Sequence, residues 1–203
     1  MSDRVRPTLI ELPTELRGER VVLRPVDPDE AETVYAAIVE SREQLRPWMH
    51  WADFHQSVDD TREQRVQFAA RWLLREELAM GVFERESNRY LGGIGLHDID
   101  WDLRRFETGY WLRTSATGRG YATEAVILVR DFAFSELRAR RLQLFCNAGN
   151  DASRRVAERA GFVLEGRLRN AVLDANGAPA DRLVFSLIPE DWQKLQAGAS
   201  KQG

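Results

Sequence analysis

Two glycines stand directly before a segment with helical periodicity, in the stretch TGRGYATEA at residues 117–125. The first amides of a helix have no partner within it, and the helix dipole adds partial positive charge at the same end. Gly118 and Gly120 allow the preceding backbone to curl, so that successive amides converge on one anion such as a pyrophosphate. A plain turn before a helix needs the same glycines, and this short motif alone favours the turn.

Two common phosphate-binding motifs do not fit this turn. A P-loop requires Lys followed by Ser or Thr after its second glycine, whereas Tyr121 and Ala122 follow Gly120. A dinucleotide fingerprint requires three glycines in a parallel βαβ unit, whereas the strand before this turn belongs to a predicted meander. An anion bound at this turn therefore needs another geometry.

Composition disfavours several other kinds of site and of protein. The chain of 203 residues has one cysteine, Cys146, and three histidines, so we expect no internal disulfide and no metal site. Its net charge of −3 disfavours direct binding to nucleic acid. No stretch reaches the roughly 20 consecutive apolar residues that cross a bilayer, and the first 13 residues lack a secretory pattern. We therefore expect a cytoplasmic protein without membrane partners.

Hydrophobic periodicity and turn residues predict one mixed α/β (α+β) domain over residues 1–203, with its core at about 18–190. Strands are expected at 20–26, 80–85, 90–99, 105–112, 141–147, 162–173 and 181–188, including a three-strand antiparallel meander and a terminal hairpin. Helices are expected at 27–39, 41–47, 58–78, 121–137 and 151–161. The helix at 58–78 should bury an apolar stripe of Val66, Ala69, Ala70, Leu73 and Leu74. We expect the tail at 196–203 to be frayed.

Four stretches of the chain occur in a suggestive order: LRPWMHWAD at 45–53, GGIGLHDID at 92–100, GYWLRTSATGRGYATEAV at 109–126 and NAGNDASRRVAERAGFVLEG at 147–166. Together they resemble the GNAT superfamily of N-acetyltransferases, and more closely its RimJ/RimL branch, which acetylates protein N-termini. One departure is Thr117, where the family often has Gln or Arg at the head of the phosphate loop. Because backbone amides do most of the phosphate binding, we expect this change to be tolerated.

The resemblance implies a mostly antiparallel sheet of about seven strands with a splayed central pair, flanked by helices. It implies acetyl-CoA as the donor, with the pantetheine arm bound to main chain in the gap between the strands at 105–112 and 141–147. The implied cofactor-binding residues are Trp111, Leu112 and Arg113 on the strand, Gly118, Arg119, Gly120, Tyr121, Ala122 and Thr123 at the pyrophosphate, and Asn147, Asn150 and Ser153 beyond.

Amine acetylation needs a neutral amine, and Glu107 is our candidate for the base that provides it. A peptide α-amine has a pKa of about 7.7–8.0, so a modest base suffices, directly or through water. Glu107 alternates with Gly109 and Trp111, which would place its side chain on the acceptor side of the gap. The alternative is a solvated strand residue paired with Arg104 or Arg105, and the sequence does not decide between the two.

Ser153 is our candidate for the acid that protonates the departing thiolate. The family pattern Asn-x-x-Ser is matched by Asn150 and Ser153, and it implies that Asn150 hydrogen-bonds the pantetheine. A helix cap and a first-turn serine would look the same, but a cap does not require both residues. Cys146 could instead accept the acetyl group covalently. It alternates with Leu142 and Leu144, however, so we expect a buried thiol and reject the covalent mechanism.

The acceptor residues that we expect are Trp48, Trp51, Tyr110 and Glu107. Of the two tryptophans, we expect one to pack in the core and the other to shape the acceptor entrance. His50 and His55 have no partners at metal-ligand spacing and receive no role. The leading prediction is direct transfer from acetyl-CoA to a protein N-terminal α-amine. An aminoglycoside, a polyamine, an aminoacyl-nucleotide, or a sensor that binds acyl-CoA without turnover stay open as alternatives, as does a homodimer.

Overall fold

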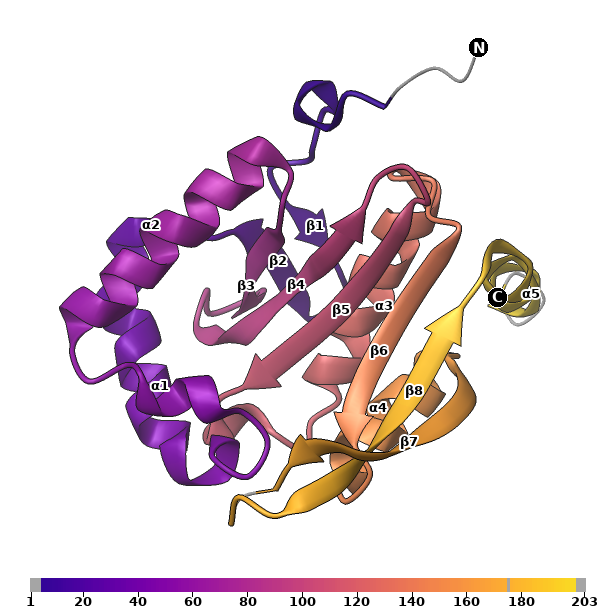
Figure 1. Cartoon of the computed structure of the whole chain (residues 1–203). Helices are drawn as coiled ribbons and strands as arrows, with labels where there is room; N and C mark the ends of the chain where they lie inside the picture. The colour runs from indigo at the N-terminus through magenta and orange to yellow at the C-terminus, as the bar shows by residue number, and fades with distance from the viewer. Residues whose placement is uncertain (1–4, 175, 200–203) are drawn as a thin grey trace.

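The computed structural model describes residues 5–174 and 176–199, which form one open sheet with helices on both faces (Figure 1). Within this part of the chain the strands are β1 (Leu16–Arg17), β2 (Val21–Pro25), β3 (Leu78–Glu84), β4 (Tyr90–Asp100), β5 (Arg105–Leu112), β6 (Arg141–Asn147), β7 (Val163–Leu173) and β8 (Pro179–Leu187). Their order across the sheet is β1-β2-β3-β4-β5-β6-β8-β7. Only β5 and β6 pair in parallel, so the expected mixed, mostly antiparallel sheet is confirmed, with the short β1 in addition.

The helices divide between the two faces of the sheet: α1 (Ala31–Leu45) and α2 (Val58–Leu74) lie on one, α3 (Tyr121–Ser135) and α4 (Asp151–Arg159) on the other (Figure 1). The main core forms under α3, where Val129 is fully buried with Phe106 and Leu142 of the central strands. A smaller core under α1 contains Val34 and Phe83 among others. None of the helices in the described residues is long and apolar enough to cross a membrane.

The central strands β5 and β6 separate after a short paired stretch, as the resemblance predicts. They pair at Arg105 with Arg141, Phe106 with Leu142, and Glu107 with Gln143, and no pair follows in the described chain. In Figure 1 the two arrows diverge from this point toward their C-terminal ends. The main-chain groups of β5 that face the opening therefore have no strand beside them, which is the arrangement that allows a ligand to add to the edge.

The first two helices differ from their predictions. The chain from 31 to 45 is one continuous helix, because Ser41, predicted to start a second piece, is buried within it. Helix α2 ends at Leu74, since Arg75 adopts a left-handed conformation with φ 60° and β3 begins soon after. The predicted apolar stripe was wrong, because Val66, Leu73 and Leu74 are 51%, 70% and 53% exposed.

Polar side chains explain the wrong stripe, because α2 buries Thr61 and Arg65 instead. The Arg65 guanidinium is 2.8 Å from the Glu30 carboxylate, and the Thr61 hydroxyl is 2.9 Å from Nδ1 of His55. These partners satisfy the polar groups, so the inward face of the helix need not be apolar. The C-terminal segment also differs, because residues Pro189–Ala199 form helix α5, where Trp192 stacks on Phe134. Residues 200–203 of the expected frayed tail lie outside the described residues.

Candidate active site

The glycine turn forms a loop of exposed amides before α3. Gly118 and Gly120 have φ values of +73° and +83°, a region that favours glycine, and Gly120 is the N-cap of α3 without a side-chain cap. Within the described residues, the amides of 118–123 donate to no protein acceptor. Thr117 directs its hydroxyl to the carbonyl of Thr114 at 2.9 Å. The loop thus presents several uncommitted donors at the positive end of a helix dipole.

Two side chains of α1 bind the segment 113–115 that leads into this loop. The sequence analysis did not select them. Glu40 forms an ion pair with the guanidinium of Arg113 and accepts a hydrogen bond from the amide of Ser115 at 2.9 Å. The Ser41 hydroxyl accepts from the amide of Thr114, also at 2.9 Å. The hydrogen bond from Arg113 lowers the pKa of the Glu40 carboxyl to about 2. The amides of Thr114 and Ser115, before the loop, are therefore occupied by protein, whereas those of 118–123 have no acceptor in the described chain.

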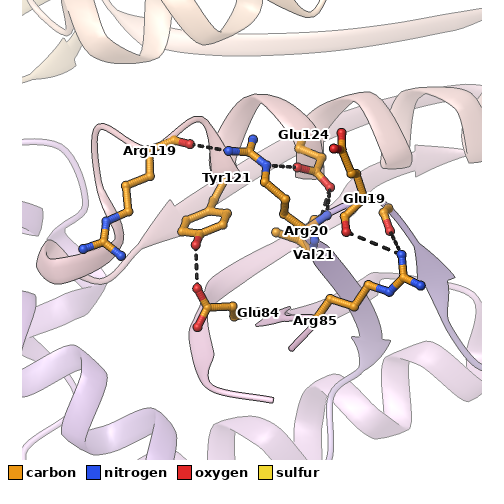
Figure 2. A network of polar contacts seen from close by, with 9 residues as sticks. Glu19, Arg20, Val21, Glu84, Arg85, Arg119, Tyr121 and Glu124 are labelled. Atoms are coloured by element: carbon orange, nitrogen blue, oxygen red, sulfur yellow. Dashed lines mark hydrogen bonds and ion pairs between the residues drawn. The ribbon is translucent and has the colours of Figure 1, made fainter. Parts of the chain in front are cut away.

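Arg20, directly before β2, contacts the end of the loop that leads into α3, as Figure 2 shows. The Arg20 guanidinium donates to the carbonyl of Arg119 at 2.8 Å and to the carboxylate of Glu124 at 2.9 Å. Glu124 also accepts from the amide of Arg20 at 2.7 Å. The Tyr121 hydroxyl donates to Glu84 at 2.5 Å on the other side of the loop. An acidic residue in the first turn of a helix is a recognisable signal, but Arg20 as its partner is not readable from sequence.

A cavity of about 500 Å³ extends from this loop toward α4. Its lining includes the predicted residues Trp48, Tyr110, Trp111, Leu112, Gly118, Gly120, Tyr121, Ala122, Thr123, Asn150 and Ser153. Arg113 is an exception, because its amide donates to the carbonyl of Leu91 at 2.8 Å and is not free for a ligand. Since hydrogen-bonding direction alternates along a strand, the main-chain groups of Leu112 and Tyr110 face the gap.

Three polar groups meet at the inner end of this cavity. The Tyr110 hydroxyl donates to Oγ of Ser153 at 3.3 Å, and Asn150 caps α4 by accepting from the amide of Ser153 at 3.0 Å. Burial raises the pKa of Tyr110 to about 12 and also raises the pKa of the Cys146 thiol. Two neutral hydroxyls are thus available to give or relay a proton, whereas Cys146 is held as an unreactive thiol.

A second cavity, of about 380 Å³, lies on the face of the sheet that α1 and α2 cover. It shares Met49, Tyr110 and Trp111 with the first cavity, so the two adjoin at β5. Trp51 lines the second cavity and lies edge-on to Trp111, with ring centroids 5.5 Å apart. Of the two tryptophans, one of which we expect in the core, Trp51 packs against the smaller core and lines the second cavity, whereas Trp48 is 43% exposed and lines the first.

Glu107 lies where the pairing of β5 and β6 ends. Its carboxylate is 3.9 Å from Nδ1 of His97, and Gln143 donates to it at 3.5 Å. Burial raises the pKa of the Glu107 carboxyl, although His97 and Arg182 oppose the shift by their charge. Glu107 does not itself line the second cavity, but His97 does. The sequence showed no reason to select His97, which becomes relevant only through its place opposite Glu107 on β4.

The remaining residues singled out in the sequence, including the two histidines without a role, line neither of the two cavities. Asn147 accepts from the amide of Gly149 at 2.9 Å and lines a neighbouring surface hollow together with Trp48. Arg119 contributes its main chain to the loop, while its carbonyl is held by Arg20. His55 is buried against Thr61, and His50 belongs to a short 3-10 turn. Among the described residues, no group of His, Cys, Asp and Glu could hold a metal ion.

Sequence and structure comparisons identify relatives of this chain. The chain is 30% identical over 177 residues to "Putative ribosomal N-acetyltransferase YdaF" of Bacillus subtilis strain 168, covering 87% of this chain and 95% of that protein. It is 32% identical over 156 residues to the ribosomal-protein-serine acetyltransferase of Escherichia coli K12, covering 76% and 85%. A solved structure of RimL in complex with coenzyme A has the same fold, with a TM-score of 0.81, 21% identity, and 86% and 97% coverage.

The family assignment rests on a family model that matches more than half of the chain. Residues 20–163, which include the β5–β6 gap, the loop and α3, match the acetyltransferase (GNAT) domain. The match begins at Arg20, so it contains the arginine whose guanidinium contacts the loop. The chain is an N-acetyltransferase and belongs to the GNAT family.

Proposed function

We propose that this enzyme transfers the acetyl group of acetyl-CoA directly to the α-amine of a protein N-terminus. The observation that carries the proposal is the meeting of two cavities at Tyr110 and Trp111, one ending at the free amides of the loop. A pyrophosphate suits those amides, and a pantetheine arm suits the open edge of β5. The acceptor would then approach from the opposite face of the sheet. RimL, which shares the fold, binds coenzyme A.

In this arrangement the two proton transfers of the reaction are carried out by residues on opposite sides of β5. The acceptor nitrogen attacks the thioester carbonyl, a C–N bond forms, and the C–S bond breaks. Glu107 receives the proton of the amine, through His97 or water, since its carboxylate lies behind His97. Ser153 donates a proton to the thiolate and can recover one from the Tyr110 hydroxyl, 3.3 Å away. Asn150 positions Ser153 by capping α4.

The lining of the second cavity favours a peptide over a polycation as acceptor. Its walls are mainly apolar and aromatic, with Ile38, Trp51 and Phe68 among them. Glu77 is the only carboxylate in this lining, and it is already paired with Arg71 at 3.0 Å. The buried guanidinium of Arg65, also in this lining, is paired with Glu30 at 2.8 Å, so both charged groups are already committed within the protein. A polyamine or aminoglycoside would find little to pair with, whereas one ammonium group followed by an apolar side chain fits.

A coenzyme A release assay over a panel of acceptors tests this proposal. The panel contains peptides that differ in their first residue, together with polyamines and aminoglycosides. We expect turnover with peptides, strongest where the first side chain is apolar, and mass spectrometry should locate the acetyl group on the α-nitrogen. Turnover confined to polycations would contradict the proposed acceptor. Tight binding of acetyl-CoA without turnover on any amine would indicate a sensor instead.

A further inference from the structure

We propose that Arg20 is a positioning residue that orients the peptide between Arg119 and Gly120, so that the Gly120 amide points at the pyrophosphate. This inference rests on the proposed acetyl-CoA site. Arg20 lies on the chain just before β2, about a hundred residues from the loop in sequence, yet its guanidinium contacts the loop from behind (Figure 2). In this proposal the Arg20 side chain contacts the main chain of the loop and none of the atoms that react.

The geometry of the peptide group carries the argument. The Arg20 guanidinium donates to the Arg119 carbonyl at 2.8 Å, and the described chain has no cis peptide bond. In a trans peptide the C=O and the following N–H point in opposite directions. Drawing the carbonyl toward Arg20 therefore turns the Gly120 amide away from Arg20, toward the cavity that Gly120 lines. A glycine at φ +83° would otherwise be free to turn this peptide.

The position of Arg20 is itself fixed on three sides. Its Nε donates to Glu124 at 2.9 Å, and its guanidinium lies over the Tyr121 ring, 5.3 Å from the centroid. A Cβ added at Gly120 would lie 3.1 Å from Nη2 of Arg20, so the guanidinium packs directly against the glycine. Glu124 also accepts from the amides of Arg20 and Val21, which joins the first turn of α3 to β2. The guanidinium is therefore held in place before any ligand arrives.

The charge of Arg20 is largely balanced by Glu124, so its effect is more directional than electrostatic. A lysine would keep the charge, but it lacks the planar fork that reaches Glu124 and Arg119 together. A hydrogen bond that involves a charged group corresponds to about a 10- to 100-fold change in equilibrium. We therefore expect Arg20→Lys and Arg20→Met each to weaken acetyl-CoA binding by about that factor. Adding Glu124→Gln to Arg20→Met should not restore affinity if orientation is what Arg20 supplies.

The experiment compares two donors in the same variants. Acetyl-CoA carries the pyrophosphate, whereas S-acetylpantetheine carries the same thioester arm without it. We expect Arg20→Met to lower kcat/KM for acetyl-CoA by about 10- to 100-fold and to leave kcat/KM for S-acetylpantetheine within about twofold. Arg85→Met is the matched control, because the Arg85 guanidinium belongs to the same network but donates to the carbonyls of Gly18 and Glu19, and the amide by which Arg85 contacts Arg20 stays in the variant.

The possible results separate this inference from the proposed function. Equal losses with both donors, or acetyl-CoA binding by Arg20→Met within about twofold of wild type in calorimetry, would overturn it. Recovery of affinity in the double variant with Glu124→Gln would also overturn it, since the loss would then come from an unbalanced carboxylate. If the unaltered enzyme fails to bind acetyl-CoA, the proposed function fails first.

Discussion

The loop before α3 and the cavity under α1 and α2 differ in which atoms face the ligand. The loop presents main-chain amides to the ligand. Side chains from other segments, Arg20 before β2 and Glu40 and Ser41 of α1, hydrogen-bond to the main chain of the loop and of the residues before it. The second cavity is lined mainly by side chains, among them the edge-on pair Trp51 and Trp111. A site built from main chain constrains only a few glycines, whereas a site built from side chains can change with each substitution.

The comparison explains why the donor is easier to infer than the acceptor. Amides that converge before a helix suit one chemical class, anions, whatever the neighbouring side chains are. An apolar cavity excludes polycations but accepts many apolar groups. A substitution that changes the binding of only one substrate would therefore support this division between donor and acceptor sites. A substitution that changes the binding of both equally would contradict it.

The largest effect is expected at the loop. Gly120→Val should remove detectable acetyl-CoA binding, because valine is strained at φ +83° and its Cβ would displace Arg20. Calorimetry with acetyl-CoA measures the loss. Gly177→Val is the matched control, because Gly177 has a similar φ of +77° in the β7–β8 turn with open space around it. Unchanged affinity in Gly120→Val would end the account of the loop as a phosphate site.

The next effect concerns the base. Glu107→Gln keeps the shape of the side chain and removes its basicity, so the rate near neutral pH should fall on the order of 10²–10⁴-fold with acetyl-CoA binding unchanged. Above the amine pKa of roughly 8 the acceptor arrives neutral, so the ratio of mutant to wild-type rate should rise from about pH 6 to 9. Burial raises the pKa of the Glu107 carboxyl, so the wild-type enzyme should lose the base, and its rate should fall, as pH drops through that raised value. A ratio that stays flat across the range would remove Glu107 from the mechanism.

A smaller effect is expected at the acid. Ser153→Ala should lower kcat by about 10- to 100-fold and change the acetyl-CoA KM less, because the proton is needed only as the C–S bond breaks. The loss is limited because the Tyr110 hydroxyl lies 3.3 Å away and can replace Ser153 in part. Wild-type kcat in Ser153→Ala would leave the residue with a structural place in α4 only.

The smallest effect is expected on the acceptor side. Trp51→Ala removes one wall of the second cavity and its edge-on contact with Trp111, so the acceptor KM should rise about 2- to 10-fold. The KM for acetyl-CoA should not change, because Trp51 does not line the first cavity. Steady-state kinetics with each substrate varied in turn makes the comparison. A rise in the acetyl-CoA KM of equal size would show that the two cavities are not separate sites.

Much of the fold could be predicted from the sequence, because alternation along strands and turn residues act over a few residues. The donor-side residues came from the resemblance to the GNAT superfamily, since the glycines before α3 alone favour a plain turn. What escaped prediction depends on partners that are distant in sequence. Arg20 contacts Arg119, Glu40 contacts Arg113, and His97 lies opposite Glu107 only because the fold brings distant segments of the chain together. The apolar stripe predicted on α2 was wrong for the same reason. The helix buries Arg65 instead, because Glu30 from another element pairs with it.

The central claim is that donor and acceptor enter from opposite faces and meet at Tyr110 and Trp111. A bisubstrate compound, with the sulfur of coenzyme A joined through an acetyl bridge to the α-nitrogen of a peptide, tests it most directly. Because one molecule would fill both cavities, it should compete with both substrates and bind about 10²–10⁴-fold more tightly than coenzyme A. Trp51→Ala and Gly120→Val should each weaken it. Competition with acetyl-CoA alone, at an affinity no better than that of coenzyme A, would contradict the account.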